Sequence, residues 1–301
     1  MTIERVAIIG LGLIGGSIGL AARAMQPEVA TTGWDADSDV RARATQRGLV
    51  GAVCDSVADA VGEADLVILC VPVGAMGYAA EAIAPHLRPG TVVSDVGSSK
   101  RSVGEALTKA LPGAVVIPAH PVAGTEKSGP DAGFAELFRH RWCILTPGKD
   151  APQDAIEAVS AFWEGLGAKV EIMDAGHHDL VLAVTSHIPH LIAYTIVGTA
   201  SDLEDVTRGE VIKYSAGGFR DFTRIAASNP TMWRDVFLSN RDAVLEVLGR
   251  FTEDLSLLQR AIRNGDGDTL FDLFDRTRTI RRSIIDEGQD DARADFGRGD
   301  H

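Results

Sequence analysis

The sequence predicts an α/β domain at the N-terminus, followed by an all-α domain at the C-terminus. Short apolar runs alternate with helical patterns in the first half, which is typical of a parallel sheet buried on both faces. A glycine-rich turn follows the first run, and strand signals stop beyond about Asp174. We expect one domain over residues 1–173 and a helical domain over 174–285. Residues 286–301, charged and poor in apolar side chains, are expected to form a disordered tail.

Composition and charge restrict the partners of this chain. Its 301 residues include 29 Lys and Arg against 42 Asp and Glu, a formal charge of −13. Nucleic acids and anionic lipids attract basic surfaces, so we expect neither as a nonspecific partner. An anionic substrate would need a locally basic pocket. The three cysteines lack CxxC spacing and are too few for a disulfide framework, which indicates the reducing cytoplasm.

Five short runs are the strand candidates of the first half: 5–9, 30–34, 66–71, 91–95 and 115–119. Two later runs, 142–146 and 169–172, flank a helical pattern over 154–166 and are candidates to extend the same sheet. Residues 180–200 carry no Asp, Glu, Lys or Arg and are long enough to cross a bilayer. Histidines within this stretch would be costly in hydrocarbon, so we expect a helix buried in protein.

A helical pattern near the C-terminus begins at Asn229-Pro230 and stops at Asn264-Gly265, judged by capping residues. Between these points six apolar residues repeat at heptad spacing: Val244, Leu248, Phe251, Leu255, Leu258 and Ile262. Such a seam fits a helix packed within its own domain and equally a homodimer contact, because three heptads are too few to separate the two.

The glycine-rich turn has the context of a dinucleotide site. The apolar run 5–9 leads into Gly10, Gly12 and Gly15, and helical spacing then begins at Leu13 and Ile14. This chemistry needs glycine for a tight turn, for close approach of backbone to pyrophosphate and for close packing of helix on strand. The anion then meets the free N–H groups of the helix N-terminus. The first domain is therefore predicted to be Rossmann-like.

Asp35 selects between the two nicotinamide dinucleotides. It lies 20 residues after Gly15, at the end of the second predicted strand, where a carboxylate binds the ribose 2′-hydroxyl of NAD and repels the phosphate of NADP. Arg41 and Arg43 follow closely and keep NADP open as an alternative. Further expected cofactor-binding residues follow two other strands: Val71, Pro72 and Ser98.

His120 is the candidate general base. It follows the strand candidate 115–119, at the edge where open α/β sheets bind ligands. Oxidation of an alcohol removes the hydroxyl proton together with a hydride, and imidazole titrates near neutral pH. Ser98, after the neighbouring strand, is placed to orient that imidazole and the substrate hydroxyl. On residues alone, a solvated loop histidine explains His120 equally well.

Two later motifs add polar groups. His187 and His190 stand three residues apart, hence near one face of a helix, and His177, His178 and Asp179 precede them. A metal site is an alternative there, although substrate contacts or satisfied core histidines are the favoured interpretations because no closed ligand spacing occurs. Two arginines, Arg220 and Arg224, follow a double glycine. Arginine binds carboxylates through two parallel hydrogen bonds, whereas surface salt bridging is the simpler alternative.

Five motifs together resemble a known family. They are GLGLIGGS from Gly10, DVGSSK from Asp95, HPVAGTEKSG from His120, SHIPH from Ser186 and GGFRDFTRIA from Gly217. In this order, and over most of residues 5–285, the chain resembles the prephenate and arogenate dehydrogenases of tyrosine biosynthesis. The resemblance implies a helical domain that makes most of a homodimer interface, which favours the dimer interpretation of the heptad seam.

The resemblance also implies a reaction and roles for residues. The reaction would be NAD-dependent oxidative decarboxylation of prephenate or arogenate, to 4-hydroxyphenylpyruvate or tyrosine, with no metal. His120 would accept the proton of the ring hydroxyl, and Ser98 would bridge His120, substrate and nicotinamide. His190 and Arg224 would bind substrate carboxylates, and Glu126 would gate the pocket. The remaining implied substrate-binding residues are His187, Ser186 and Thr125.

Two other functions stay open at this point. A 3-hydroxyacid dehydrogenase has similar architecture but uses a lysine in its helical domain, where this chain has only Lys213, without a supporting motif. A noncatalytic dinucleotide-sensing module would not explain His120, His190 and Arg224 together.

Overall fold

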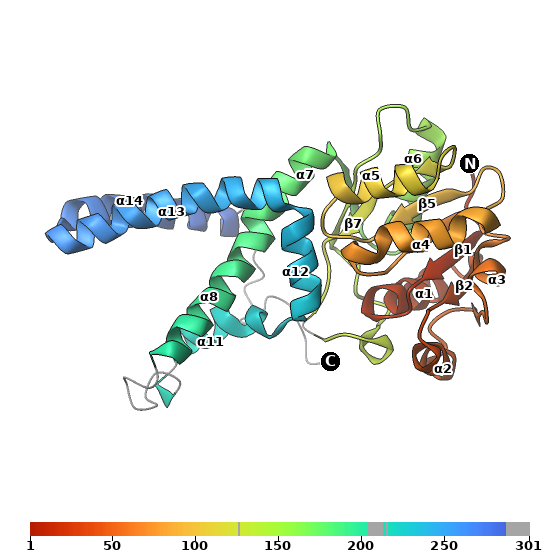
Figure 1. The fold of residues 1–301 in the computed structure, drawn as a ribbon, viewed down its shortest axis with the longest axis horizontal. Coiled ribbons are helices and arrows are strands. Elements are labelled where there is room, and N and C mark those ends of the chain that lie inside the picture. Colours follow the sequence, from red (N-terminus) through yellow and green to blue (C-terminus); the bar gives the residue numbers. More distant parts are fainter. Residues whose placement is uncertain (126, 204–212, 215, 287–301) are drawn as a thin grey trace. The chain divides into compact units, whose positions relative to one another are not determined.

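The structure, a computed structural model, describes residues 1–125, 127–203, 213–214 and 216–286. Residues up to Leu245 form one compact unit, and the described residues from Glu246 form a second. The predicted order, an α/β portion with a parallel sheet followed by helices, is confirmed (Figure 1). The boundary after residue 173 stays a prediction, and the expected tail beyond residue 286 lies outside the described residues.

Six parallel strands form the first sheet, in the order β3-β2-β1-β4-β5-β6. This is the order of the dinucleotide-binding fold, in which ligands bind where the order reverses, here between β1 and β4. The strands are β1 (Arg5–Ile9), β2 (Ala30–Trp34), β3 (Ala52–Val53), β4 (Leu66–Leu69), β5 (Val92–Asp95) and β6 (Val115–Val116). The short β3 was not predicted.

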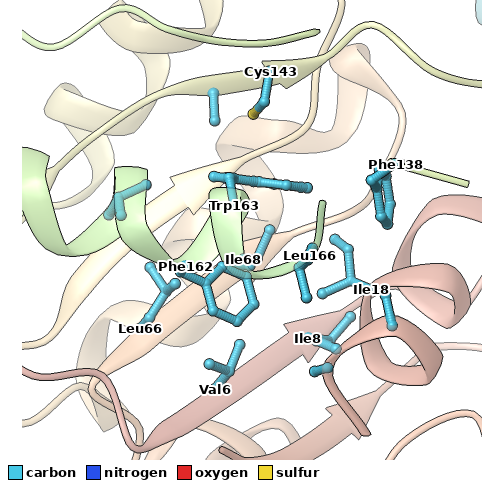
Figure 2. Packing of buried hydrophobic residues seen from close by; sticks show 14 of the residues in the cluster. Val6, Ile8, Ile18, Leu66, Ile68, Phe138, Cys143, Phe162, Trp163 and Leu166 are labelled. Atoms are coloured by element: carbon cyan, nitrogen blue, oxygen red, sulfur yellow. The ribbon is translucent and has the colours of Figure 1, made fainter. Parts of the chain in front are cut away.

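Helices cover both faces of this sheet, and alternate residues of β1 show why. Val6 and Ile8 point into a core shared with α1 and α6, whereas Ala7 and Ile9 point into a core shared with α3, α4 and α5 (Figure 2 shows the first core). Each large side chain buried in these cores contributes roughly 1.5–3 kcal/mol. The helices are α1 (Leu13–Met25), α2 (Ser38–Arg47), α3 (Val57–Val61), α4 (Met76–Ile83), α5 (Arg101–Ala110) and α6 (Gln153–Gly165).

The later strands form a sheet of their own instead of extending the first. Strands β7 (Ala119–Pro121), β8 (Trp142–Leu145) and β9 (Lys169–Ile172) pair in that order, β7 antiparallel to β8. The predicted strand 115–119 is thus divided between two sheets at Pro118. Ile117 still donates to Val93 of the first sheet, whereas the carbonyl of Pro118 accepts from Thr146 after β8.

Only helices and turns follow β9 in the described part of the chain, as predicted. Asp174 caps α7 (Ala175–Leu182) by accepting from the backbone of Gly176 and His177. A π-helical turn, Ala183–His187, joins α7 to α8 (Ile188–Asp202), and Pro189, which cannot donate a backbone hydrogen bond, lies just after it. The remaining helices are α11 (Gly217–Thr223), α12 (Pro230–Ser239), α13 (Arg241–Asn264) and α14 (Gly267–Asp286).

The apolar run from Ala175 to Asp202 is long and apolar enough to cross a membrane by length and composition alone, and 28% of its most apolar stretch is buried. Ala183, Ile188 and Ala193 are buried, whereas Ile196 and Val197 are exposed. The expected burial within the protein is therefore met only in part.

The helix pattern between Asn229 and Asn264 is interrupted, which the sequence pattern did not indicate. Asn229 caps α12 as expected, but α12 ends at Ser239 and α13 starts at Arg241. Asn240 lies between them, buried, and its side chain donates to the carbonyl of Asp179 at 2.7 Å. The break thus places a buried amide against α7.

Candidate active site

The three glycines of the turn differ in what a side chain would meet. Gly10 has a φ of +99°, and a Cβ there would lie 2.4 Å from the carbonyl oxygen of Cys70 after β4. A Cβ on Gly15 would lie 1.9 Å from the carbonyl oxygen of Gly10, so α1 can pack on the turn only without one. A Cβ on Gly12 would meet nothing within 4 Å. This open backbone at the start of α1 fits the pyrophosphate of a dinucleotide.

Asp35 lies beside the same turn. Its Oδ2 accepts the backbone N–H of Leu11 at 2.8 Å, and its Oδ1 accepts that of Asp37 at 3.0 Å. Arg41 donates to the carbonyl of Asp35 at 2.7 Å, whereas Arg43 pairs with Asp131. The carboxylate therefore stands where the adenosine ribose is expected, with one arginine next to it.

The other predicted cofactor residues surround this turn. Leu13 and Ile14 are the first residues of α1. Val71 and Pro72 follow β4, the strand next to β1, and Val71 lies within van der Waals reach of a Cβ on Gly10. Ser98, half-buried, lies in the loop after β5. All five thus lie at the carboxyl edge of the sheet, four of them at the switch between β1 and β4 and Ser98 after the next strand, β5.

His120 lies inside β7, buried, and not in an exposed loop. Its neighbour Ala119 donates a backbone hydrogen bond to Asp95 Oδ1 at 3.2 Å, which ties β7 to the end of β5. The Nδ1 of His120 lies 2.9 Å from Nε2 of His178, and the Nδ1 of His178 lies 2.9 Å from Oδ1 of Asp179. The solvated interpretation of His120 does not apply in this fold.

The carboxylate of Asp179 anchors this chain of groups. Oδ1 accepts the backbone N–H of Lys100 at 2.7 Å, and Oδ2 accepts that of Arg101 at 3.0 Å. Burial raises the pKa of Asp179, but hydrogen bonds from His178 and from these two backbone groups outweigh it and leave the pKa lowered. The sequence did not link His178 and Asp179 to His120, since nothing in a local pattern shows a contact 58 residues away.

His187 is fully buried in the turn before α8. The amide nitrogen of Asn240 lies 3.1 Å from its Nδ1, and its Nε2 is buried without a partner among the described residues. Because the amide donates, neutral His187 carries its proton on Nε2. Burial lowers the pKa of His187 to about 4. Asn240 was not identified from the sequence, although a polar residue inside an apolar helical pattern was a usable signal.

His190 stacks on Trp233 of α12, with ring centroids 3.7 Å apart. Its Nδ1 lies 2.9 Å from the carbonyl oxygen of Ser186, which only accepts, so neutral His190 has an unprotonated Nε2. Burial lowers its pKa, and the positive charge of Arg224, at the end of α11, lowers it further. Arg224 is thus close enough to His190 to act on its charge.

Two predicted residues contribute less to this arrangement. Thr125 is exposed, and its hydroxyl accepts from the backbone of Lys127 at 3.2 Å. Glu126 lies outside the described residues. In the parts of the chain that the structure describes, no group of three His, Cys, Asp or Glu side chains is placed to hold a metal ion, and His177 is exposed.

Known proteins resemble this chain in sequence and in fold. The family model for the prephenate dehydrogenase nucleotide-binding domain matches residues 18–172, and that for the prephenate dehydrogenase dimerization domain matches residues 174–276. The chain belongs to the prephenate dehydrogenase family. The family, fold class and class of enzyme predicted from the sequence are thereby confirmed.

Individual relatives agree. A cyclohexadienyl dehydrogenase of Zymomonas mobilis is 47% identical over 281 residues, which cover 93% of this chain and 96% of that protein. A prephenate dehydrogenase of A. aeolicus, solved with hydroxyphenyl propionate and NAD+, superposes with a TM-score of 0.88 at 31% identity, covering 94% of this chain and 99% of that one. A Synechocystis arogenate dehydrogenase gives a TM-score of 0.80 at 25% identity, covering 93% and 99%.

Proposed function

We propose that this protein catalyses the NAD-dependent oxidative decarboxylation of prephenate, arogenate or both, which yields 4-hydroxyphenylpyruvate or tyrosine. Membership of the family supports this reaction, and NAD is the cofactor expected from Asp35 and bound by the A. aeolicus relative. The observation that carries the proposal is His120. Its imidazole is buried, His178 engages Nδ1, and Nε2 meets no hydrogen-bond partner within the described chain.

His120 has the properties of a base for the ring hydroxyl. Burial lowers its pKa well below the ordinary value, and the facing groups His178, Lys100 and His187 act in the same direction, so the imidazole is neutral near pH 7. Bound NAD supplies the acceptor for the hydride that leaves the hydroxyl-bearing ring carbon. His120 takes the hydroxyl proton at Nε2 as the carbonyl forms. It returns that proton to the oxygen when carbon dioxide leaves and the ring becomes aromatic.

Arg224 and two histidines are proposed to hold the polar groups of the substrate. Arg224 supplies the paired donors that suit a carboxylate. The Nε2–H of His187 is a buried donor that a second carboxylate would satisfy, and such a donor costs about 1–3 kcal/mol when left unpaired. The unprotonated Nε2 of neutral His190 accepts instead. Ser186 orients His190 through its carbonyl.

The rival functions receive no support from this geometry. Lys213, the lysine that a 3-hydroxyacid dehydrogenase would need, is exposed, and its Nζ lies over the ring of Tyr214, 5.3 Å from the ring centroid. A sensing module needs no buried imidazole beside its dinucleotide turn. The roles of Ser98, Thr125 and Glu126 are proposed from their motif positions alone.

The protein is further proposed to act as a cytoplasmic homodimer that pairs through its helical domain. The match to a dimerization domain supports pairing, and so do apolar side chains exposed on α8, at Ile196 and Val197. In the unit from Glu246 onward, the heptad residues Leu255 and Ile262 are also exposed, so packing within that unit leaves them uncovered. Light scattering after gel filtration should give twice the mass of one chain. The free cysteines suit the cytoplasm.

Initial rates with prephenate and with arogenate, each in the presence of NAD and of NADP, test the proposed reaction. Reduced nicotinamide should form with NAD and at least one of the two substrates, and carbon dioxide should form in equal amount. A protein that binds NAD but oxidises neither substrate would contradict the proposal. The comparison of the two substrates also decides which side chain, keto or amino, the site prefers.

The variant His120→Asn is the matched control for this assay. Loss of a general base costs about 10²- to 10⁴-fold in turnover, so kcat should fall by at least about two orders of magnitude. NAD affinity should stay nearly unchanged, because Gly12 and Asp35 and not His120 line the dinucleotide turn. Near-normal turnover would remove His120 from the mechanism.

A further inference from the structure

We propose that His178 and Asp179 are positioning residues that decide which nitrogen of His120 is the base. The three side chains form a continuous line: Asp179 Oδ1 to His178 Nδ1 at 2.9 Å, and His178 Nε2 to His120 Nδ1 at 2.9 Å. His178 is completely buried, His120 is 8% exposed and Asp179 is 5% exposed. This inference rests on the proposed function only in that it assigns His120 a proton to accept.

An ionised Asp179 can only accept hydrogen bonds. Both of its oxygens receive backbone N–H groups, those of Lys100 and Arg101 at the start of α5. These bonds hold the carboxylate in place and favour its ionised form. The nitrogen of His178 that faces an ionised carboxylate must therefore carry a proton. That nitrogen is Nδ1.

The protonation of His178 then determines that of His120. A neutral imidazole with a proton on Nδ1 has a lone pair on Nε2, so His178 accepts at the nitrogen that faces His120. The proton between the two rings consequently belongs to Nδ1 of His120. The second nitrogen of neutral His120, Nε2, is left with its lone pair free for the hydroxyl of a substrate.

The opposite arrangement is unfavourable for a physical reason. If His120 carried its proton on Nε2, His178 would have to donate from its own Nε2. Neutral His178 would then turn a lone pair at Nδ1 toward the carboxylate of Asp179, and the two would repel. A doubly protonated His178 would avoid this repulsion. Burial and the charge of Lys100 disfavour that form, whereas Asp179 and Asp95 favour it. The net effect is a lowered pKa of His178, so the neutral form prevails.

The same line of groups stabilises the charge that His120 acquires. When Nε2 takes the hydroxyl proton, His120 becomes positive in a buried site that already faces Lys100, His178 and His187. The negative charge of Asp179 reaches it through His178, which strengthens the hydrogen bond from Nδ1. Both oxygens of the carboxylate are bonded within the protein, to Lys100, Arg101 and His178, so Asp179 acts through His120.

Substitution of Asp179 and His178 tests the proposal. Asp179→Asn removes the negative charge that requires a proton on Nδ1 of His178, so both imidazoles can reverse, which leaves Nε2 of His120 protonated and blocked. Serine proteases lose on the order of 10⁴-fold in kcat when the orienting carboxylate is changed in this way. We expect kcat to fall on the order of 10³- to 10⁴-fold, with KM and NAD affinity within about threefold of the wild type.

Two further variants separate positioning from general loss of structure. His178→Phe removes the acceptor, whereas His178→Gln offers its carbonyl oxygen to Nδ1 of His120, so the glutamine variant should retain clearly more kcat than the phenylalanine variant. His177→Gln, on the exposed neighbour, should match the wild type. Because Asp179 also holds the start of α5, thermal unfolding of each variant is recorded, and the His178 pair tests the proposal even where Asp179→Asn does not fold.

A readout without turnover keeps the two proposals distinguishable. NMR of the histidine ring nitrogens, with His120→Asn for assignment, should show His120 protonated on Nδ1 in the wild type and on Nε2 in Asp179→Asn. Equal kcat in the wild type and His178→Phe, or the Nε2 form in the wild type, would overturn this inference. An inactive wild type with the expected ring protonation would overturn only the proposed function.

Discussion

Lys100 and Asp95 form an ion pair that is completely buried, with Nζ 2.5 Å from Oδ2. The Nζ of Lys100 also donates to the carbonyl of Ala119 at 2.6 Å, and Asp95 Oδ2 accepts the backbone N–H of Gly97 at 2.7 Å. The pair thus joins the loop that carries Ser98 to the strand that carries His120. Burial lowers the pKa of Lys100, against the attraction of Asp95.

Removal of one partner should be costly. Lys100→Ala leaves a buried carboxylate without its cation, and we expect a loss of about 3–5 kcal/mol in the free energy of unfolding, measured by urea denaturation. The double variant Lys100→Met with Asp95→Asn should recover part of that loss, because no charge stays unpaired. Lys109→Ala, on the exposed side of α5, is the control. Equal stability of Lys100→Ala and Lys109→Ala would show that the pair contributes nothing.

Substitution of two glycines should separate folding from dinucleotide binding. Gly15→Ala places a Cβ 1.9 Å from a backbone oxygen, so it should lower the melting temperature as well as NAD affinity. Gly12→Ala has room within the fold and should leave the melting temperature unchanged while it weakens NAD binding, measured by fluorescence titration. Unchanged NAD affinity in Gly12→Ala would place the pyrophosphate elsewhere.

Asp35 should control the choice of dinucleotide. Asp35→Asn removes the negative charge that repels a 2′-phosphate, and Arg41 lies next to it, so the ratio of NAD to NADP in kcat/KM should fall by tenfold or more, a change of about 1.4 kcal/mol. Asp37→Asn, at the N-cap of α2, is the matched control and should leave the ratio as it is. A constant ratio in both variants would contradict the assignment.

Arg224 should act on binding more than on turnover. Loss of its paired donors to a substrate carboxylate should raise KM in Arg224→Ala by at least tenfold, with a smaller change in kcat. Arg250→Ala, which removes a surface pair with Glu246 on α13, is a control of the same residue type. If KM is the same in both variants, the carboxylate is bound by another residue.

The buried histidines should make the protein less stable in acid. The pKa of His187 is about 4 in the folded chain, below the 6.5 of an exposed histidine, so the unfolded state binds the proton first. The free energy of unfolding is therefore unaffected by His187 above pH 6.5. As the pH falls from 6.5 toward 4, protonation of the unfolded state lowers the free energy of unfolding by roughly 3 kcal/mol in all. His120 and His178 act in the same direction. Urea titrations across this range measure the effect.

A comparison of two variants assigns that pH dependence. In His187→Gln the slope of the unfolding free energy against pH should be smaller by up to about 1.4 kcal/mol per pH unit, whatever the variant does to stability at neutral pH. His177→Gln removes an exposed imidazole and should keep the wild-type slope. Identical slopes in the two variants would show that His187 titrates normally.

Local patterns were sufficient to predict the main strands and the glycine turn of the first sheet. Strands β1, β2 and β9 begin and end where the apolar runs predict. The turn at Gly10, Gly12 and Gly15 has the steric roles that its spacing indicates. Such features depend on neighbours within a few residues, because a tight turn and a helix start are made by the backbone that carries them. The sequence by itself also determined the family and the enzyme class.

Only the tertiary structure decided the surroundings of His120. Pro118 divides a predicted strand between two sheets, and Asn240 interrupts a predicted helix to reach Asp179. His178 meets His120 across 58 residues of sequence. The protonation of an imidazole follows from the groups that face its two nitrogens, and those groups come from strands and helices brought together by packing. The spacing of residues along the chain does not show which groups face an imidazole. The sequence motifs could therefore identify His120 as the candidate base but not its hydrogen-bond partners.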